Sequence, residues 1–232
     1  MRNFAVTLIA FVTKIIRMRR ILSFFMMSIV VITAWAQDRT FESCPLEVIA
    51  ENWKSKPIER VVNGSLGIML EAFDKTWPTY VVAEAREVME KGLEKYVDPN
   101  DETERTVVND AANGYVEVSD AGTDSEYMSA CVWNRSNGHR LFAVEIGKLT
   151  DPDINFVCFY DYDEYTWMLR PEPNILVGVP PLMREWQRSY KLPRKGKDMV
   201  IVDYGPGIKR THYLKWNGMK PVYRSTEESK FE

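Results

Sequence analysis

Histidine and cysteine are both scarce in this chain, which holds 2 and 3 of them among 232 residues. His139 and His212 lie far apart, and no G-x-S-x-G, H-E-x-x-H or paired C-x-x-C motif occurs. A hydrolytic triad needs a histidine beside its nucleophile, and a zinc site needs clustered ligands. The motifs therefore point to no catalytic residue, no metal site and no cofactor.

The cysteines are too few and too dispersed to form a disulfide scaffold, because three of them cannot all pair. Cys44 follows Phe-Glu-Ser, which is not a signal for lipid attachment. Cys131 and Cys158 lie in apolar segments typical of strands, where a buried thiol behaves as a small hydrophobic group. We expect both thiols to be free.

Acidic residues are absent from the first 36 positions, which carry five basic residues. An uncharged run over residues 21–36 follows Arg19-Arg20 and ends in Ala34-Trp35-Ala36. This pattern is typical of an export signal that is cleaved before Gln37. Met18 offers a second start of translation for the same signal. The alternative is an uncleaved membrane anchor, although the run is shorter than the roughly 20 residues that span a bilayer. We expect a periplasmic or outer-surface protein.

The charge that remains after cleavage is acidic. Taking 5 from 30 basic residues leaves 25 against 33 acidic ones, a formal net charge of −8. Such a surface is a poor general binder of nucleic acid, since phosphate contacts need clustered Lys and Arg. No later segment is long and apolar enough to span a membrane. The mature chain is therefore expected to have neither a nucleic-acid partner nor a transmembrane segment.

Helical periodicity dominates residues 43–96 of the mature chain. Ser43 is a candidate cap for a first helix, and a break at Trp77-Pro78 precedes a stronger amphipathic pattern over residues 80–96 with Thr79 as its cap. A polar loop, residues 98–104, ends this part.

The period changes to 2 over the β-rich part, residues 107–224. Two Asn-Gly dipeptides, at 137–138 and 217–218, are typical of hairpin turns. The expected strands cover residues 115–120, 127–135, 139–147, 154–162, 165–171, 199–205, 211–216 and 219–224.

A two-residue turn at Asn137-Gly138 would place Trp133 opposite Phe142 and both on one core face. If 154–162 pairs next to 139–147, Cys131 and Cys158 lie two strands apart. Two strand spacings are about 9.5 Å, which is too far for a disulfide.

An insertion at residues 171–198 separates the fifth and sixth strands, and we expect a short helix in it over residues 182–190. Helices followed by consecutive antiparallel strands predict an α+β fold. The expected architecture is one domain, residues 37–232. Its N-terminal helices pack on a mostly antiparallel sheet of six to eight strands, a meander of hairpins.

One turn combines carboxylates with aromatic rings, as glycan-binding and glycosidase sites do. The simpler alternative is a β-turn whose Asp side chains satisfy local backbone groups. The candidate binding residues are Tyr160, Asp161, Tyr162, Asp163, Glu164 and Trp167.

The insertion also carries a cluster of positive charge. On an acidic protein it could dock an anionic partner, whereas most basic loops are merely solvated. The candidate residues are Arg184, Arg188, Arg194, Lys195 and Lys197.

Three segments, SNGHRLFAVEIG, the FYDYD turn and the closing HYLKWNGMKPVY, resemble uncharacterised exported proteins of Bacteroidales-type bacteria. The resemblance covers the C-terminal half and implies a periplasmic or outer-surface setting. With no converging catalytic set, the leading interpretation is a non-enzymatic binding or structural module of the cell envelope, its partner an envelope glycan or a protein. The alternative is a carbohydrate-active or other hydrolase that uses the carboxylates of the Asp161–Glu164 turn.

Overall fold

The computed structural model describes residues 43–97, 102–119, 126–151 and 153–230. The expected export signal, its cleavage site and the boundary at residue 37 all lie outside these residues. None of the helices in the described segments is long and apolar enough to cross a membrane.

The helical part lies where the periodicity predicts it. Thr79 caps the last helix by accepting a hydrogen bond from the Val82 N–H at 3.2 Å, as expected. That helix ends earlier than expected, at Lys91, because Gly92 takes a left-handed conformation (φ 63°). The helices are α2 (Leu46–Asn52), α3 (Leu66–Thr76) and α4 (Tyr80–Lys91), with a 3-10 turn at Trp53–Ser55.

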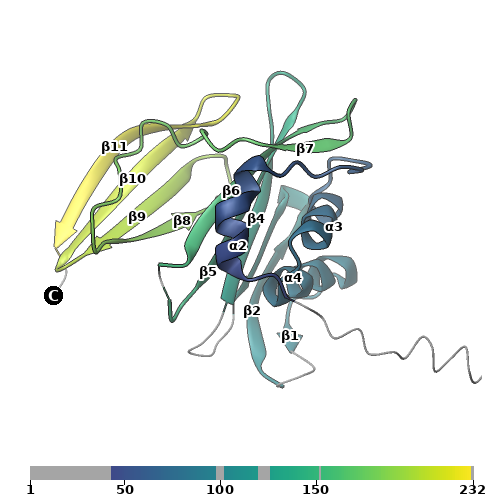
Figure 1. Cartoon of the computed structure of the whole chain (residues 1–232), viewed down its shortest axis with the longest axis horizontal. Coiled ribbons are helices and arrows are strands. Elements are labelled where there is room, and N and C mark those ends of the chain that lie inside the picture. Colours follow the sequence, from purple (N-terminus) through teal and green to yellow (C-terminus); the bar gives the residue numbers. More distant parts are fainter. Residues whose placement is uncertain (1–42, 98–101, 120–125, 152, 231–232) are drawn as a thin grey trace, which may run out of the picture. The chain divides into compact units, whose positions relative to one another are not determined.

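Seven consecutive strands form an antiparallel meander in the order β1-β2-β3-β4-β5-β6-β7. The α+β fold with an antiparallel meander is therefore confirmed (Figure 1). The strands are β1 (Tyr96–Val97), β2 (Glu104–Asp110), β3 (Tyr115–Ser119), β4 (Glu126–Asn134), β5 (Arg140–Lys148), β6 (Asn155–Asp163) and β7 (Met168–Pro171).

A second antiparallel sheet of four strands follows in the order β11-β10-β9-β8. The helix expected over residues 182–190 is wrong, because Gln187–Lys191 is strand β8 and pairs with β9. Glu185 has a positive φ of 65°, which interrupts any helix there, and the edge of β9 offers backbone partners. The other strands are β9 (Met199–Gly205), β10 (Ile208–Trp216) and β11 (Pro221–Lys230).

The first hairpin turn is longer by one residue than the predicted two-residue turn at Asn137-Gly138. The Arg135 N–H donates to the His139 carbonyl at 2.9 Å, and the Gly138 N–H donates to the Arg135 carbonyl at 3.2 Å. With Gly138 at φ 87°, this is a three-residue loop with a bulge. Trp133 therefore pairs with Leu141, not with Phe142.

The extra residue shifts the pairing of the two strands by one position. Because strand side chains alternate between faces, Trp133 and Phe142 then lie on opposite faces of the sheet. Phe142 faces the helices, whereas Trp133 faces the second sheet. The predicted common core face for these two residues is wrong.

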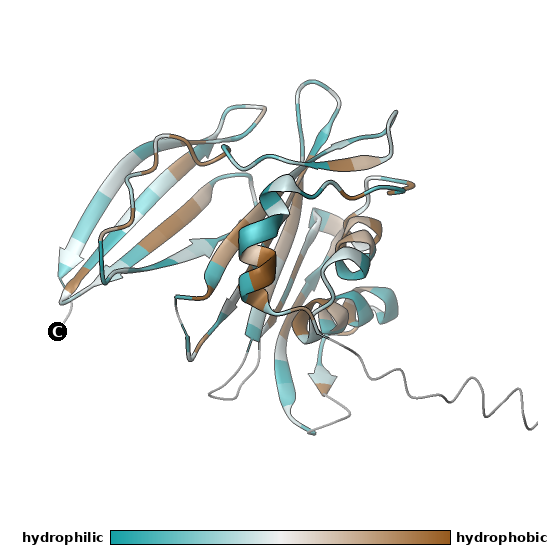
Figure 2. Cartoon of the chain, viewed as in Figure 1, coloured by the Kyte–Doolittle hydropathy of each residue, from teal (hydrophilic) through white to brown (hydrophobic). Residues whose placement is uncertain are grey.

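Both faces of the seven-stranded sheet carry buried residues. On one face Phe142 and Tyr160 pack against Phe73 of α3, with ring centroids 6.2 Å apart in each case. On the other, Trp133 stacks on Trp216 of β10 with centroids 5.7 Å apart. Figure 2 shows apolar residues on strands and helices where these elements adjoin.

The cysteines are free, as expected. Cys131 and Cys158 lie on β4 and β6 with β5 between them, which confirms the predicted strand order. They also face opposite sides of the sheet, Cys158 toward the helices and Cys131 toward the second sheet. Burial raises the pKa of both thiols well above the ordinary value.

Candidate functional site

The aromatic residues of the predicted binding turn divide between core and solvent. Tyr160 and Tyr162 are buried on the helix side of β6. The Tyr160 hydroxyl accepts a hydrogen bond from the Trp77 indole at 3.3 Å, and that of Tyr162 donates to the Val61 carbonyl at 3.1 Å. Both rings are thus parts of the core.

Asp161 points to the other face of β6 and neutralises a buried cation. The Arg135 guanidinium lies 2.5 Å from its carboxylate, and His139 Nδ1 lies 2.7 Å away. Arg135 also forms two hydrogen bonds to Glu172, at 2.6 and 2.7 Å. These contacts tie the turn of the first hairpin to β6 and to the segment after β7.

The tip of the turn is exposed. Asp163 accepts hydrogen bonds from the Tyr165 N–H at 3.0 Å and from the Thr166 hydroxyl at 3.2 Å, and the first of these lowers the pKa of Asp163. Glu164 and Trp167 lie in solvent beside Tyr165, which is 90% exposed. The six predicted binding residues therefore do not form one surface.

The predicted basic cluster is also divided. Arg188 pairs with the buried Asp203 at 2.6 Å, and Arg194 pairs with Asp110 at 2.8 Å. Lys197 lies over the ring of Trp216, 5.5 Å from its centroid. Arg184 and Lys195 are exposed.

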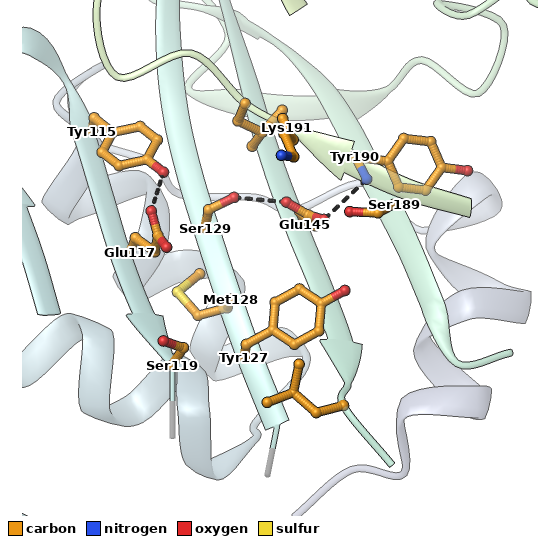
Figure 3. A pocket seen from close by; sticks show the side chains of 12 residues that line it. Tyr115, Glu117, Ser119, Tyr127, Met128, Ser129, Glu145, Ser189, Tyr190 and Lys191 are labelled. Carbon is orange, nitrogen blue, oxygen red and sulfur yellow. Dashed lines mark hydrogen bonds between the residues drawn. The ribbon is translucent and has the colours of Figure 1, made fainter. Parts of the chain in front are cut away.

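A groove that the sequence patterns did not indicate has a volume of about 560 Å³. It lies on the face of the seven-stranded sheet that carries Trp133, at the end where the face becomes polar, and β8 forms one wall (Figure 3). Its floor includes a row of direct cross-strand partners, Glu117 on β3, Ser129 on β4 and Glu145 on β5. Because direct partners project to one face, this row presents two carboxyl groups to one groove.

Glu145 is the most deeply buried carboxyl group of the groove, with 4% of its surface exposed. It accepts hydrogen bonds from the Ser129 hydroxyl at 2.9 Å and from the Tyr190 backbone N–H at 3.1 Å. Burial raises the pKa of Glu145 to about 7, although these two hydrogen bonds lower it. The Glu145 carboxyl group therefore titrates near neutral pH.

The carboxylate of Glu117 is positioned by a side chain of its own strand, β3. The Tyr115 hydroxyl donates to its carboxylate at 2.6 Å, and burial and this bond raise the pKa of Tyr115. The hydroxyl thus stays protonated and orients the carboxylate at the rim of the groove.

An aromatic wall completes the groove. The ring of Tyr127 lies over Gly147, its partner on β5, so closely that a Cβ there would be 2.6 Å from the ring. Tyr190 and Lys191 line the side formed by β8. The groove thus combines carboxylates, hydroxyl groups, one ammonium group and aromatic rings.

Sequence reasoning missed this site for a definite reason. Glu145 and Glu117 each stand alone in an apolar alternating segment, and a single sheet would have left their faces in solvent. Only the second sheet, which covers this face, turns a carboxylate there into a buried group. The sequence signal that could have indicated this site is a single carboxylate within an otherwise apolar strand.

The comparisons add no relative. No family model, no curated protein and no solved structure matches the chain. In the segments that the structure describes, no cluster of His, Cys, Asp and Glu is suited to hold a metal ion.

The raised pKa of Glu145 predicts a pH dependence of stability. A carboxyl group with a pKa of about 7 when folded and about 4.3 when unfolded binds more protons in the folded state between these values. Its contribution is therefore most favourable below about pH 4.3 and falls by about 4 kcal/mol as the pH rises through 7.

Urea unfolding at pH 5 and pH 8 measures this dependence. Glu145→Gln keeps an acceptor for the Tyr190 N–H but cannot ionise, so the variant should gain stability relative to wild type at pH 8 and not at pH 5. An unchanged difference between variant and wild type at the two pH values would contradict the prediction.

Proposed function

We propose that this chain is an exported binding module of the bacterial cell envelope that takes a hydroxyl-rich ligand, a short segment of glycan, in the groove beside Glu145. The observation that carries the proposal is a buried carboxyl group that opens on a groove lined by aromatic rings and hydroxyl groups.

The chemistry of the lining suits sugar hydroxyl groups. Glu117 and Glu145 accept hydrogen bonds, Ser119 and Ser189 both donate and accept, and Lys191 donates. Sites for small ligands commonly combine a few fixed polar groups with aromatic contact area, and here Tyr127 and Tyr190 supply the rings.

Export to the envelope is the second part of the proposal. It is supported by the charge and hydropathy pattern of residues 1–36. N-terminal sequencing of the protein from its native host should find Gln37 first. A start at Met18 or earlier would contradict cleavage.

Calorimetric titration with maltotriose, cellotriose and chitotriose tests the ligand class. At least one of the three trisaccharides should bind, and Glu117→Gln and Tyr127→Ala should each weaken its binding about tenfold, or about 1.4 kcal/mol. Glu51→Gln, which changes an exposed carboxylate of α2, is the matched control and should bind as wild type does. Failure of all three sugars to bind, or an equal loss in the control, would overturn the proposal.

A further inference from the structure

We propose that the groove also cleaves a glycosidic bond, with Glu145 as proton donor and Glu117 as the base that activates water. This inference rests on the proposed function, since the sugar must first bind in the groove.

The strand pairing fixes how far apart the backbones of Glu117 and Glu145 lie. Glu117 and Glu145 are both direct partners of Ser129, so one strand lies between their strands. Two strand spacings are about 9.5 Å between backbones. Inverting glycosidases hold their carboxyl groups roughly 6.5–9.5 Å apart to leave room for a water molecule beside the sugar.

The two groups also lie in different surroundings. Glu145 is buried, and burial keeps a population of its protonated form near neutral pH. Glu117 is only half-buried and is oriented by the Tyr115 hydroxyl at 2.6 Å. Such a difference between two carboxyl groups in one site is how one serves as the acid and the other as the base.

The reaction balances with water as the only co-reactant. The Glu145 carboxyl group gives its proton to the glycosidic oxygen as the bond from that oxygen to the anomeric carbon breaks. Glu117 takes a proton from the water whose oxygen forms the new bond to that carbon from the opposite side. A net proton transfer through solvent from Glu117 to Glu145 restores both groups, and the sugar is released with inverted configuration.

The 4-nitrophenyl glycosides that correspond to the three trisaccharides are the first substrates, with full-length mature protein. Wild type should release nitrophenol from at least one of them, and the rate should fall as the pH rises above about 7, where Glu145 ionises. The other titratable groups that face Glu145 in the groove are Glu117, Tyr115, Tyr127, Tyr190 and Lys191. Glu145→Gln and Glu117→Gln should each lower kcat by about 10²- to 10⁴-fold.

A change of leaving group separates the acid from a residue that only supports the fold. With a 2,4-dinitrophenyl glycoside, which leaves without a proton, Glu145→Gln should recover most of its rate, whereas Glu117→Gln should not. Glu51→Gln, at an exposed carboxylate of α2, should be as active as wild type on both substrates. NMR of the first product should show the inverted anomer.

The outcomes distinguish the two proposals. Trisaccharide binding without release of nitrophenol from any glycoside would overturn the cleavage and leave the binding module standing. Activity that survives both substitutions would also overturn it. Absence of both binding and cleavage would overturn the inference together with the proposed function.

Discussion

Replacing Asp203 by Asn is expected to lower the free energy of unfolding by about 3–5 kcal/mol, the cost of breaking a buried ion pair from one side. Asp203 is 3% exposed and forms two hydrogen bonds to the Arg188 guanidinium, at 2.6 and 2.7 Å. A third comes from His212 Nε2 at 2.9 Å. Asn would leave the half-buried Arg188 without its counter-charge.

The same residues join all four strands of the second sheet. Arg188 lies on β8, Asp203 on β9 and His212 on β10, and His212 Nδ1 contacts the Thr226 hydroxyl of β11 at 2.6 Å. Burial alone would raise the pKa of Asp203, but the hydrogen bonds from Arg188 and His212 outweigh it and lower the pKa. The stabilisation is present above the unfolded pKa of about 3.9 and is lost as the pH falls through the lower folded pKa.

Glu228→Gln is the matched control in the same sheet. It removes the charge from an exposed pair with Arg210, at 2.9 Å, and should cost at most about 1 kcal/mol. Denaturant unfolding at pH 7 measures both variants. Equal losses in the two variants would show that the buried network is not what holds β8 on the sheet.

Replacing Phe142 by Ala is the second change with a large expected effect, a loss of about 3–5 kcal/mol. Phe142 is fully buried between the seven-stranded sheet and the helices, in contact with Phe73 and Tyr160. The truncation removes a ring from a close-packed region. It leaves a cavity, because the surrounding sheet and helix relax only partially into the vacated space.

Tyr165→Ala is its control, because it also removes an aromatic ring. Tyr165 is 90% exposed, so its loss should change the free energy of unfolding by no more than about 0.5 kcal/mol. A cost for Phe142→Ala below about 1.5 kcal/mol would mean that the helices do not close over this face of the sheet as described.

The groove depends on the same layering as these two predictions. Glu145 lies on the strand that carries Phe142, three residues further along, and therefore points to the opposite face. β8 of the second sheet forms one wall over that face, and burial raises the pKa of the carboxyl group. The proposed binding and cleavage both require the second sheet to stay in place.

Strand positions could be predicted from the sequence to a considerable extent. Each of the eight expected strands overlaps an observed one, because period-2 alternation and Asn-Gly turns are local properties of the chain. The register of the first hairpin could not be predicted from the sequence, because Asn-Gly suits both a two-residue turn and a three-residue loop with Gly138 at positive φ. One residue of difference placed Trp133 and Phe142 on opposite faces.

The predicted site residues show the same division. One of the two alternatives for the FYDYD segment was a turn whose Asp side chains bind local backbone groups, and Asp163 does accept a hydrogen bond from the Tyr165 N–H. Asp161 pairs with Arg135 and His139, and Arg188 pairs with Asp203. These partners are distant in the sequence, so no local pattern could predict the contacts.

By itself, the sequence determined most of the succession of helices and strands, with β1, β2 and β8 missed, and the free state of Cys131 and Cys158, because these depend on local periodicity and strand order. Only the tertiary structure decided that residues 187–191 form a strand, that both faces of the main sheet are covered, and that Glu117 and Glu145 share a groove. These features depend on side chains from segments far apart in the chain, and their energies exist only when those segments pack together.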